Sequence, residues 1–237
     1  MLIKQKYKSS TSSDDPTIRI LELGIADGVT AFPLCTNLTL LGCAYSYEGI
    51  DIKLSESLRE QYAYTLELWK SLTIIEQTTT KFLQLKKEEP PIVYDLVLVD
   101  GDHNYDTVKA ECELLSNFID SSTILLFDDY GGKFATEDQY YAHHEGYESN
   151  PLITDPLTKD ASSPVGVKAA VNEFIANNIH LQPAHLFPPS LCSALLVINR
   201  NSPLWSYNVA DDPRAKSDWD WLSDMFYGEH KEVKSTI

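Results

Sequence analysis

The chain has 237 residues, of which 43% are hydrophobic, and its formal net charge is -16 at pH 7. This length and composition allow the core of one α/β domain, and the negative charge disfavours nucleic acid and anionic membrane surfaces as partners. The four cysteines form no Cys-x-x-Cys pair. No apolar run reaches the ~20 residues of a membrane helix, and the N-terminus has no signal-peptide pattern. We therefore expect a soluble, cytoplasmic protein with free thiols.

The chain alternates between β-rich segments and segments with helical periodicity. Residues 1–16 are polar and predict a flexible lead-in. Buried or β-rich runs predict strands over residues 17–23, 45–52, 72–77, 94–99 and 123–127. Helical patterns start near Thr30, Leu54, Tyr105 and Ser163-Pro164, where Ser163 would be the cap. Two further strands, over about 179–187 and 191–199, are expected to form a C-terminal hairpin through residues 188–190.

This alternation predicts an α/β fold with a doubly wound, mostly parallel, seven-stranded sheet of the Rossmann-like type. Residues 17–200 would form one domain. Within it, residues 131–163 show no clear period and predict a lid or insert. Residues 201–237 would pack on the same domain as a C-terminal extension, and their tryptophans suit core packing or a homodimer contact.

A glycine turn follows the first predicted strand, in the sequence Glu22-Leu23-Gly24-Ile25-Ala26-Asp27-Gly28. Glycine lets the backbone turn sharply and approach a ligand closely. By itself the turn is a weak signal, and the third glycine of the Gly-x-Gly-x-x-Gly dinucleotide motif is missing. Asp51 ends the second strand, about 25 residues later, where a carboxylate can accept hydrogen bonds from a ribose diol. Together the two features favour a ligand that contains a nucleoside.

Acidic side chains follow two neighbouring predicted strands. Asp100, Asp102 and His103 come directly after residues 94–99, and Asp128 and Asp129 directly after residues 123–127. The carboxyl ends of parallel strands share one edge of a sheet, so these groups should lie close together. That much negative charge requires a cation or a proton, and carboxylates suit Mg²⁺. A merely structural role, as a cap of the next helix, would explain Asp102 or Asn104 but not the whole set.

The glycine turn, Asp51, the run Val99-Asp100-Gly101-Asp102-His103-Asn104-Tyr105 and the run Phe127-Asp128-Asp129-Tyr130 resemble the class I S-adenosylmethionine-dependent methyltransferases. The resemblance extends over about residues 17–199 and is strongest to the small-molecule O-methyltransferases of macrolide and aminocoumarin sugars. The Asp-Gly-Asp-His-x-Tyr and Asp-Asp-Tyr motifs carry most of its specificity.

The resemblance implies a role for each matching residue. Glu22, Gly24, Ala26 and Gly28 would border the methionine part of the cofactor, with Thr30 and Asp100 also at the cofactor, and Asp51 would hold the ribose. Thr79 would lie near adenine, although family members often carry an aspartate there. Asp100, Asp128 and Asp129 would bind the metal ion, and His103 or Asp102 would be the general base.

The expected reaction is transfer of a methyl group from S-adenosylmethionine to a hydroxyl of a small-molecule acceptor, assisted by Mg²⁺. Three alternatives remain open from the sequence. The enzyme could work without a metal and use His103 as its base. The chain could be a non-catalytic module that binds a nucleoside or S-adenosylmethionine, or it could be a dinucleotide-dependent oxidoreductase.

Overall fold

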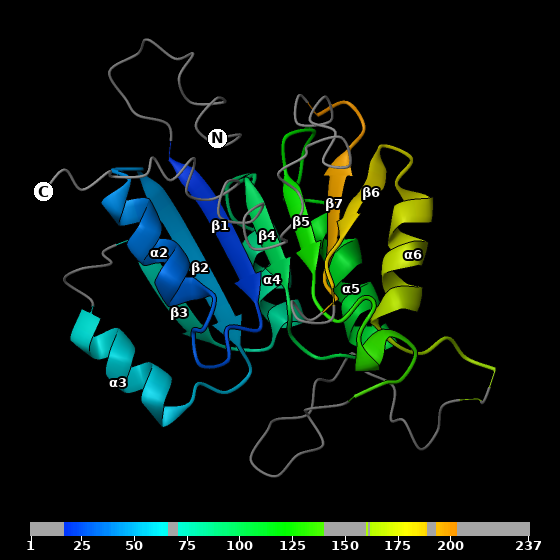
Figure 1. Cartoon of the computed structure of the whole chain (residues 1–237), viewed down its shortest axis with the longest axis horizontal. Helices are drawn as coiled ribbons and strands as arrows, with labels where there is room; N and C mark the ends of the chain where they lie inside the picture. Colours follow the sequence, from blue (N-terminus) through cyan, green and yellow to red (C-terminus); the bar gives the residue numbers. More distant parts are fainter. Residues whose placement is uncertain (1–16, 66–70, 140–159, 161, 189–192, 203–237) are drawn as a thin grey trace, which may run out of the picture.

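A computed structural model describes residues 17–65, 71–139, 160, 162–188 and 193–202 as one mixed sheet with helices on both faces (Figure 1). The predicted lead-in, the C-terminal extension and most of the predicted lid fall outside these ranges. The strands are β1 (Ile18–Leu23), β2 (Tyr45–Asp51), β3 (Leu72–Glu76), β4 (Leu96–Val99), β5 (Ile124–Phe127), β6 (Leu181–Leu186) and β7 (Leu195–Asn199). The helices are α2 (Ala31–Leu40), α3 (Glu56–Thr65), α4 (Thr79–Lys87), α5 (Tyr105–Leu115), α6 (Val167–Asn177) and the short 3₁₀ helix η1 (Lys133–Ala135).

The seven strands lie in the order β3-β2-β1-β4-β5-β7-β6. The first five strands of the chain pair in parallel, whereas β7 runs antiparallel to both β5 and β6. This arrangement confirms the predicted doubly wound α/β fold and its C-terminal hairpin. The direction of the strand order reverses between β1 and β4, and a ligand site is expected beyond their carboxyl ends.

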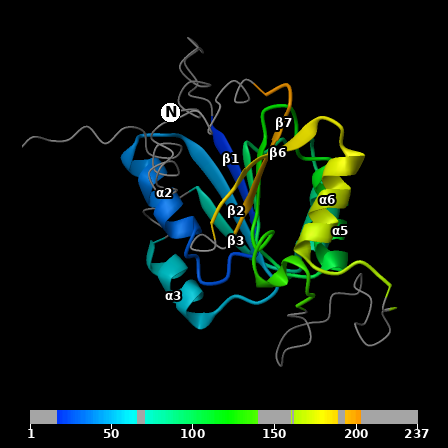
Figure 2. The same cartoon turned by 45° about the vertical axis from the view of Figure 1, so that its right-hand side comes forward.

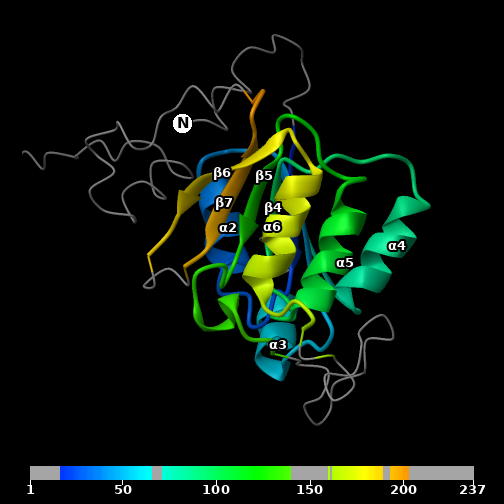
Figure 3. The same cartoon turned by 90° about the vertical axis from the view of Figure 1, so that its right-hand side faces the viewer.

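Two apolar layers enclose the sheet. The side chains of α2 and Leu58 of α3 pack on one face, where they meet Ile20, Tyr47 and Leu98. Helices α4, α5 and α6 cover the other face, where they meet Leu21, Val97 and Phe127 (Figures 2 and 3). Since alternate residues of one strand belong to different layers, the central strands are buried on both faces, as their continuous apolar sequences predicted. No helix in the described ranges combines the length and the apolar character needed to cross a membrane.

The structure corrects three details of the predicted elements. Helix α4 was not expected, because its buried face includes Thr79 and Thr80 beside Phe82 and Leu83, so the apolar period is weak. The strand predicted from residue 94 begins at Leu96.

Helix α6 begins later than predicted, at Val167, and its N-cap is Gly166 rather than Ser163. Gly166 has a φ of 79°, and a Cβ atom there would lie 2.4 Å from the carbonyl oxygen of Ala135. The backbone conformation and this close contact both require glycine, and the helix starts where the chain leaves that contact.

Candidate active site

The glycine turn joins the ends of β1, β2 and β4. Gly24 has a φ of +92°, and a Cβ atom there would lie 2.0 Å from the carbonyl oxygen of Asp100. Only glycine permits the two backbones to approach this closely. Ala26 also has a positive φ, 45°, and its N–H donates to Oδ2 of Asp51 at 2.8 Å. The turn therefore holds the Asp51 carboxylate at the switch point of the sheet.

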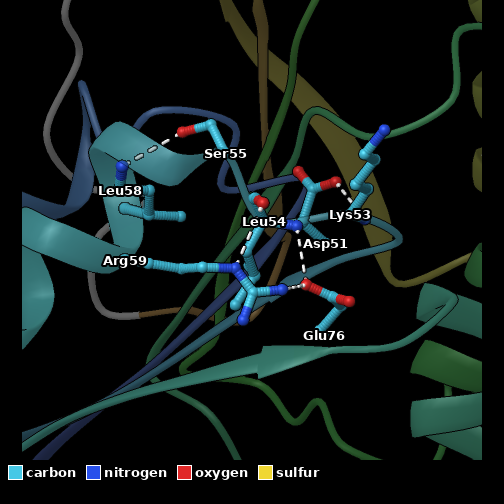
Figure 4. A network of polar contacts seen from close by, with 7 residues as sticks. All are labelled: Asp51, Lys53, Leu54, Ser55, Leu58, Arg59 and Glu76. Carbon is cyan, nitrogen blue, oxygen red and sulfur yellow. Dashed lines mark hydrogen bonds and ion pairs between the residues drawn. The ribbon is translucent and has the colours of Figure 1, made fainter. Parts of the chain in front are cut away.

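The loop that follows Asp51 is held by side chains from β3 and α3 (Figure 4). Lys53 N–H donates to Asp51 Oδ1 at 3.2 Å, and Leu54 N–H donates to Glu76 Oε2 at 3.0 Å. The guanidinium of Arg59 forms an ion pair with the same Glu76 carboxylate. Burial raises the pKa of Asp51, although backbone N–H donors favour its ionised form. The loop is thus fixed in place before any ligand binds.

A pocket of about 340 Å³ lies at this edge of the sheet. Its lining includes seven residues that were named from the sequence: Gly24, Ala26, Asp51, Thr79, Asp100, Asp102 and His103. It also includes Asp27, Ile52, Lys53, Ser55, Thr78, Gly101 and Thr107. The size and concave shape of the pocket suit a small ligand. The pocket lies at the strand ends where the sequence predicted a nucleoside-binding site.

Three residues expected beside the cofactor do not line this pocket. Glu22 is 2% exposed and accepts a hydrogen bond of 2.6 Å from the hydroxyl of Tyr47, beneath the sheet edge. Burial raises the pKa of Glu22 to about 8, so its carboxyl is mostly neutral at pH 7. Gly28 packs near Phe32 and Leu58, and Thr30 is the exposed N-cap position of α2.

His103 lies between carboxylates from two strand ends. Its Nε2 atom is 3.2 Å from Oδ1 of Asp100, and its Nδ1 atom is 2.9 Å from Oδ2 of Asp129. Burial lowers the pKa of His103, but the nearby carboxylates of Asp100, Asp129 and Asp128 outweigh it and hold this pKa above its ordinary value. Both ring nitrogens thus face carboxylates, and these contacts orient the imidazole.

Among the described residues, Asp100, His103 and Asp128 are a group that could hold a metal ion, with one ligand atom from each lying within 4.8 Å of the others. Burial and then the Asp100 carboxylate raise the pKa of Asp128 to about 8. Asp129, which the resemblance assigned to the metal, is directed to His103 instead. It has a φ of 51°, a conformation that an aspartate tolerates better than most residues.

Asp102 is tied to the start of α5. Its Oδ2 atom accepts hydrogen bonds from Asn104 Nδ2 at 2.6 Å and from Thr107 Oγ1 at 3.0 Å. Asn104 is the N-cap, and its side chain accepts from Thr107 N–H at 2.8 Å. Of the two candidate bases, Asp102 is therefore bonded to the start of α5, whereas His103 contacts carboxylates.

Two residues near the site were not singled out from the sequence. Glu111 is fully buried in α5 and accepts a hydrogen bond from Thr79. Asp138 accepts backbone N–H bonds from both Tyr105 and Gly166, at 2.8 and 2.7 Å. Glu111 falls among the buried apolar residues of α5, and a single charged residue in such a helical pattern can be recognised from the sequence. Asp138 lies in an aperiodic segment that offers none.

Comparison with known proteins agrees with this fold. Residues 21–130 match the model of a family described as a methyltransferase domain. The CMeT domain of the citrinin polyketide synthase is similar in structure, with a TM-score of 0.50 and 15% identity. The match covers 85% of this chain and 51% of that one, so the chain spans about half the length of that domain.

Two further solved structures are similar at lower scores. An O-methyltransferase from Bacillus cereus, in complex with SAH, has a TM-score of 0.48 and 13% identity, and the match covers 76% of this chain and 72% of that one. Fibrillarin from Aeropyrum pernix, with natively bound S-adenosyl-L-methionine, has a TM-score of 0.47 and 12% identity, with coverages of 76% and 66%. No curated protein matches the sequence significantly.

The strand order, the antiparallel β7 and the position of the pocket agree with the sequence match. The sheet has the Rossmann-like fold of the class I methyltransferases. The sequence match to the methyltransferase domain runs from β1 to the residues after β5.

Proposed function

We propose that the protein transfers a methyl group from S-adenosylmethionine to a hydroxyl of a small-molecule acceptor. One observation carries the proposal: the pocket at the switch point of the sheet continues from Asp51 to His103. One cavity therefore contains a carboxylate that can bind a ribose diol and an imidazole that can transfer a proton.

Different residues of the pocket would bind different parts of the cofactor. Each oxygen of Asp51 already accepts at least one backbone N–H bond. A carboxylate oxygen has a second lone pair, so Asp51 can still accept from the two ribose hydroxyls. Gly24 and Asp100, at the ends of the two central strands, lie where the methionine part would pass.

His103 is the group that we assign as general base. Its Nε2 atom would exchange its contact with Asp100 for the acceptor hydroxyl and accept the proton of that hydroxyl, while Asp129 holds the ring through Nδ1. The new bond forms between the acceptor oxygen and the methyl carbon as the bond from that carbon to the sulfonium sulfur breaks. Most of the rate gain would come from holding the two reactants in line within the pocket.

Three side chains at this edge of the sheet also fit a divalent cation as ligands. Asp100, Asp128 and His103 would hold it, since two carboxylates and one imidazole provide the ligands. A bound ion would supply Lewis-acid activation of the acceptor hydroxyl. His103 cannot use Nε2 as a metal ligand and as a base at the same time, so the two roles exclude each other. A metal-independent enzyme with His103 as base is therefore the alternative form of the same proposal.

The binding step is tested by calorimetry with S-adenosylhomocysteine on the full chain. We expect Asp51→Asn to weaken binding at least tenfold, about 1.4 kcal/mol, through loss of the charged acceptor. Asp95→Asn is the matched control. Asp95 also accepts a backbone N–H bond, from Arg19 at 2.9 Å, but it precedes β4 at the opposite end of the strand. Absence of binding to the wild-type protein would refute the proposal.

The metal is tested separately with Mg²⁺ and Mn²⁺ in the absence of cofactor. If the ion is held as described, calorimetry detects a site that Asp128→Asn removes and Asp129→Asn retains. Binding should strengthen as the pH rises toward 8, because the ion competes with the proton on Asp128. A wild-type protein that binds neither ion and still methylates an acceptor supports the metal-independent form.

A further inference from the structure

Two lysine side chains near His103 each rest on an aromatic ring. The Nζ atom of Lys133 lies 4.9 Å from the centre of the Phe134 ring, and the Nζ atom of Lys168 lies 5.7 Å from the centre of the Tyr130 ring. Both lysines are exposed, and neither forms an ion pair within the part of the chain that the structure describes. A cation–π contact holds an ammonium group in place without neutralising it, so both charges remain available to a ligand.

The two rings belong to the surroundings of the proposed base. The centre of the Phe134 ring lies 5.1 Å from that of the His103 ring, in an edge-on arrangement. Tyr130 directly follows Asp129, whose carboxylate contacts His103 Nδ1. Both aromatic residues come after β5, whereas Asp51 ends β2, on the opposite side of the switch point between β1 and β4 (Figure 1). The lysines are therefore on the side of the site that the nucleoside leaves to the acceptor.

Two contacts fix the segments that carry the lysines against each other. Each lysine is two residues from the close approach of the Gly166 backbone to the carbonyl oxygen of Ala135. The hydroxyl of Tyr130 also donates to Oδ1 of Asn172 in α6, at 2.8 Å. The two charges thus belong to one junction between η1 and α6, although they come from separate parts of the chain.

Helix stability does not explain the position of Lys168. It is the second residue of α6, and the first turn of this helix contains no acidic residue. A cation in the first turn opposes the helix dipole, whereas an anion there is favoured. Lys168 therefore lies where it weakens the helix slightly, unless an anion binds beside it.

We propose that Lys133 and Lys168 form an anion subsite for the acceptor, which carries a carboxylate or phosphate group in addition to the hydroxyl that is methylated. This inference rests on the proposed function and names the acceptor class. The site also holds the carboxylates of Asp100, Asp128 and Asp129, which repel an anionic acceptor. The two ammonium groups offset this repulsion and donate charge-assisted hydrogen bonds to the anion.

The test uses two pairs of acceptors whose members differ by one anionic group: catechol with protocatechuate, and glucose with glucose 6-phosphate. Calorimetry on the full chain, saturated with S-adenosylhomocysteine, gives the ratio of the dissociation constants within each pair. In at least one pair we expect the anionic member to bind about tenfold more tightly than the neutral one, as a charged hydrogen bond commonly allows. This preference should weaken as salt is added.

Substitution of the lysines should remove the preference. Lys133→Gln and Lys168→Gln should each lower it, and the double variant should abolish or reverse it, because the carboxylates of the site then act unopposed. Lys168→Arg keeps the charge and should keep the preference. Lys87→Gln is the matched control, since Lys87 is an exposed lysine at the end of α4, away from the pocket. All these positions are exposed, so binding of S-adenosylhomocysteine should be unchanged in every variant.

The possible results separate this inference from the proposed function. A wild-type protein that does not bind S-adenosylhomocysteine would show that the proposed function is wrong. If it binds that ligand but binds neither anionic compound more tightly than its neutral partner, only the anion subsite is wrong. A preference that survives in the double variant would also overturn the subsite. A preference confined to protocatechuate would identify the anion as a carboxylate, and one confined to glucose 6-phosphate would identify it as a phosphate.

Discussion

At the scale of single residues, His103 lies between two carboxylates. Asp129 contacts one ring nitrogen, and Asp100 lies beside the other. The side chain of His103 is only 11% exposed, so these contacts are largely shielded from water. Carboxylates beside both ring nitrogens orient the ring and favour its protonated form, in agreement with the raised pKa of His103.

The substitution Asp129→Asn should keep the fold and lose most of the activity. Asparagine adopts a positive φ as readily as aspartate does, and position 129 has a φ of 51°. The amide cannot stabilise a protonated imidazole, so we expect methyl transfer to fall by about 10²-fold or more. The measurement uses tritiated S-adenosylmethionine with a panel of phenols and sugars, together with a thermal melt. Unchanged turnover would exclude Asp129 as the orienting group.

The sequence predicted which residues converge at the site, but not how they pair. Strand ends place Asp100, His103 and Asp128 on one edge of a parallel sheet, and this much follows from position alone. The pairing depends on backbone angles and on contacts with other segments. Asp129 turns to His103 through its left-handed conformation, and Glu22 turns beneath the edge because Tyr47 from β2 donates to it. Neither contact can be predicted from the sequence around Asp129 or Glu22.

At the scale of elements, one carboxylate connects the beginnings of two helices. Asp138 Oδ1 accepts from the N–H of Tyr105, the first residue of α5, and from the N–H of Gly166, the N-cap of α6. The N–H groups at a helix start have no partner within the helix, and a negative charge there is favoured by the helix dipole. The next residue, Gln139, donates its N–H to the carbonyl oxygen of His103 at 2.9 Å.

Removal of this link should destabilise the protein measurably. We expect Asp138→Ala to lower the free energy of unfolding by about 1–2 kcal/mol, the usual cost of losing a partly buried helix cap. Asp138→Asn keeps the acceptor and should cost less. Asp160→Ala is the control, since Asp160 accepts a backbone bond from Ser162 N–H outside both helices. Urea unfolding measures all three, and equal effects at positions 138 and 160 would contradict the assignment.

The predicted elements were accurate where the apolar period was clear. Helix α5 begins at Tyr105 as expected, because its buried stripe and its Asn104 cap are both local signals. Helix α4 was missed because threonines take part of its buried face. The start of α6 was misplaced because Ser163-Pro164 forms a plausible local cap, whereas the observed start depends on the contact between Gly166 and Ala135.

At the scale of the whole molecule, a buried carboxyl links folding to pH. Glu22 is neutral in the folded protein because burial raises its pKa from 4.5 to about 8. The folded state therefore holds this proton more tightly than the unfolded state does. Its stabilising contribution is complete below about pH 4.5 and is lost as the pH rises toward 8, by at most about 1.4 kcal/mol per pH unit.

The substitution Glu22→Gln should flatten this dependence. Glutamine keeps an acceptor for the Tyr47 hydroxyl and cannot ionise, so the variant should gain stability over the wild-type protein as the pH rises from 5 to 8. Urea unfolding at each pH unit across this range gives the two slopes. Parallel curves for the two proteins would show that Glu22 does not ionise differently on folding.

The attachment of the segment between Asp138 and Gly166 has a consequence for engineering. The chain departs at a carboxylate and returns to an N–H that donates to that same carboxylate, so the two ends of the segment meet while α5 and α6 stay in place. We expect that the intervening sequence can be exchanged between related enzymes without loss of the fold when Asp138 and Gly166 are kept as junctions. Transplanting such cassettes would show whether acceptor choice is inherited with that stretch of chain or with the sheet.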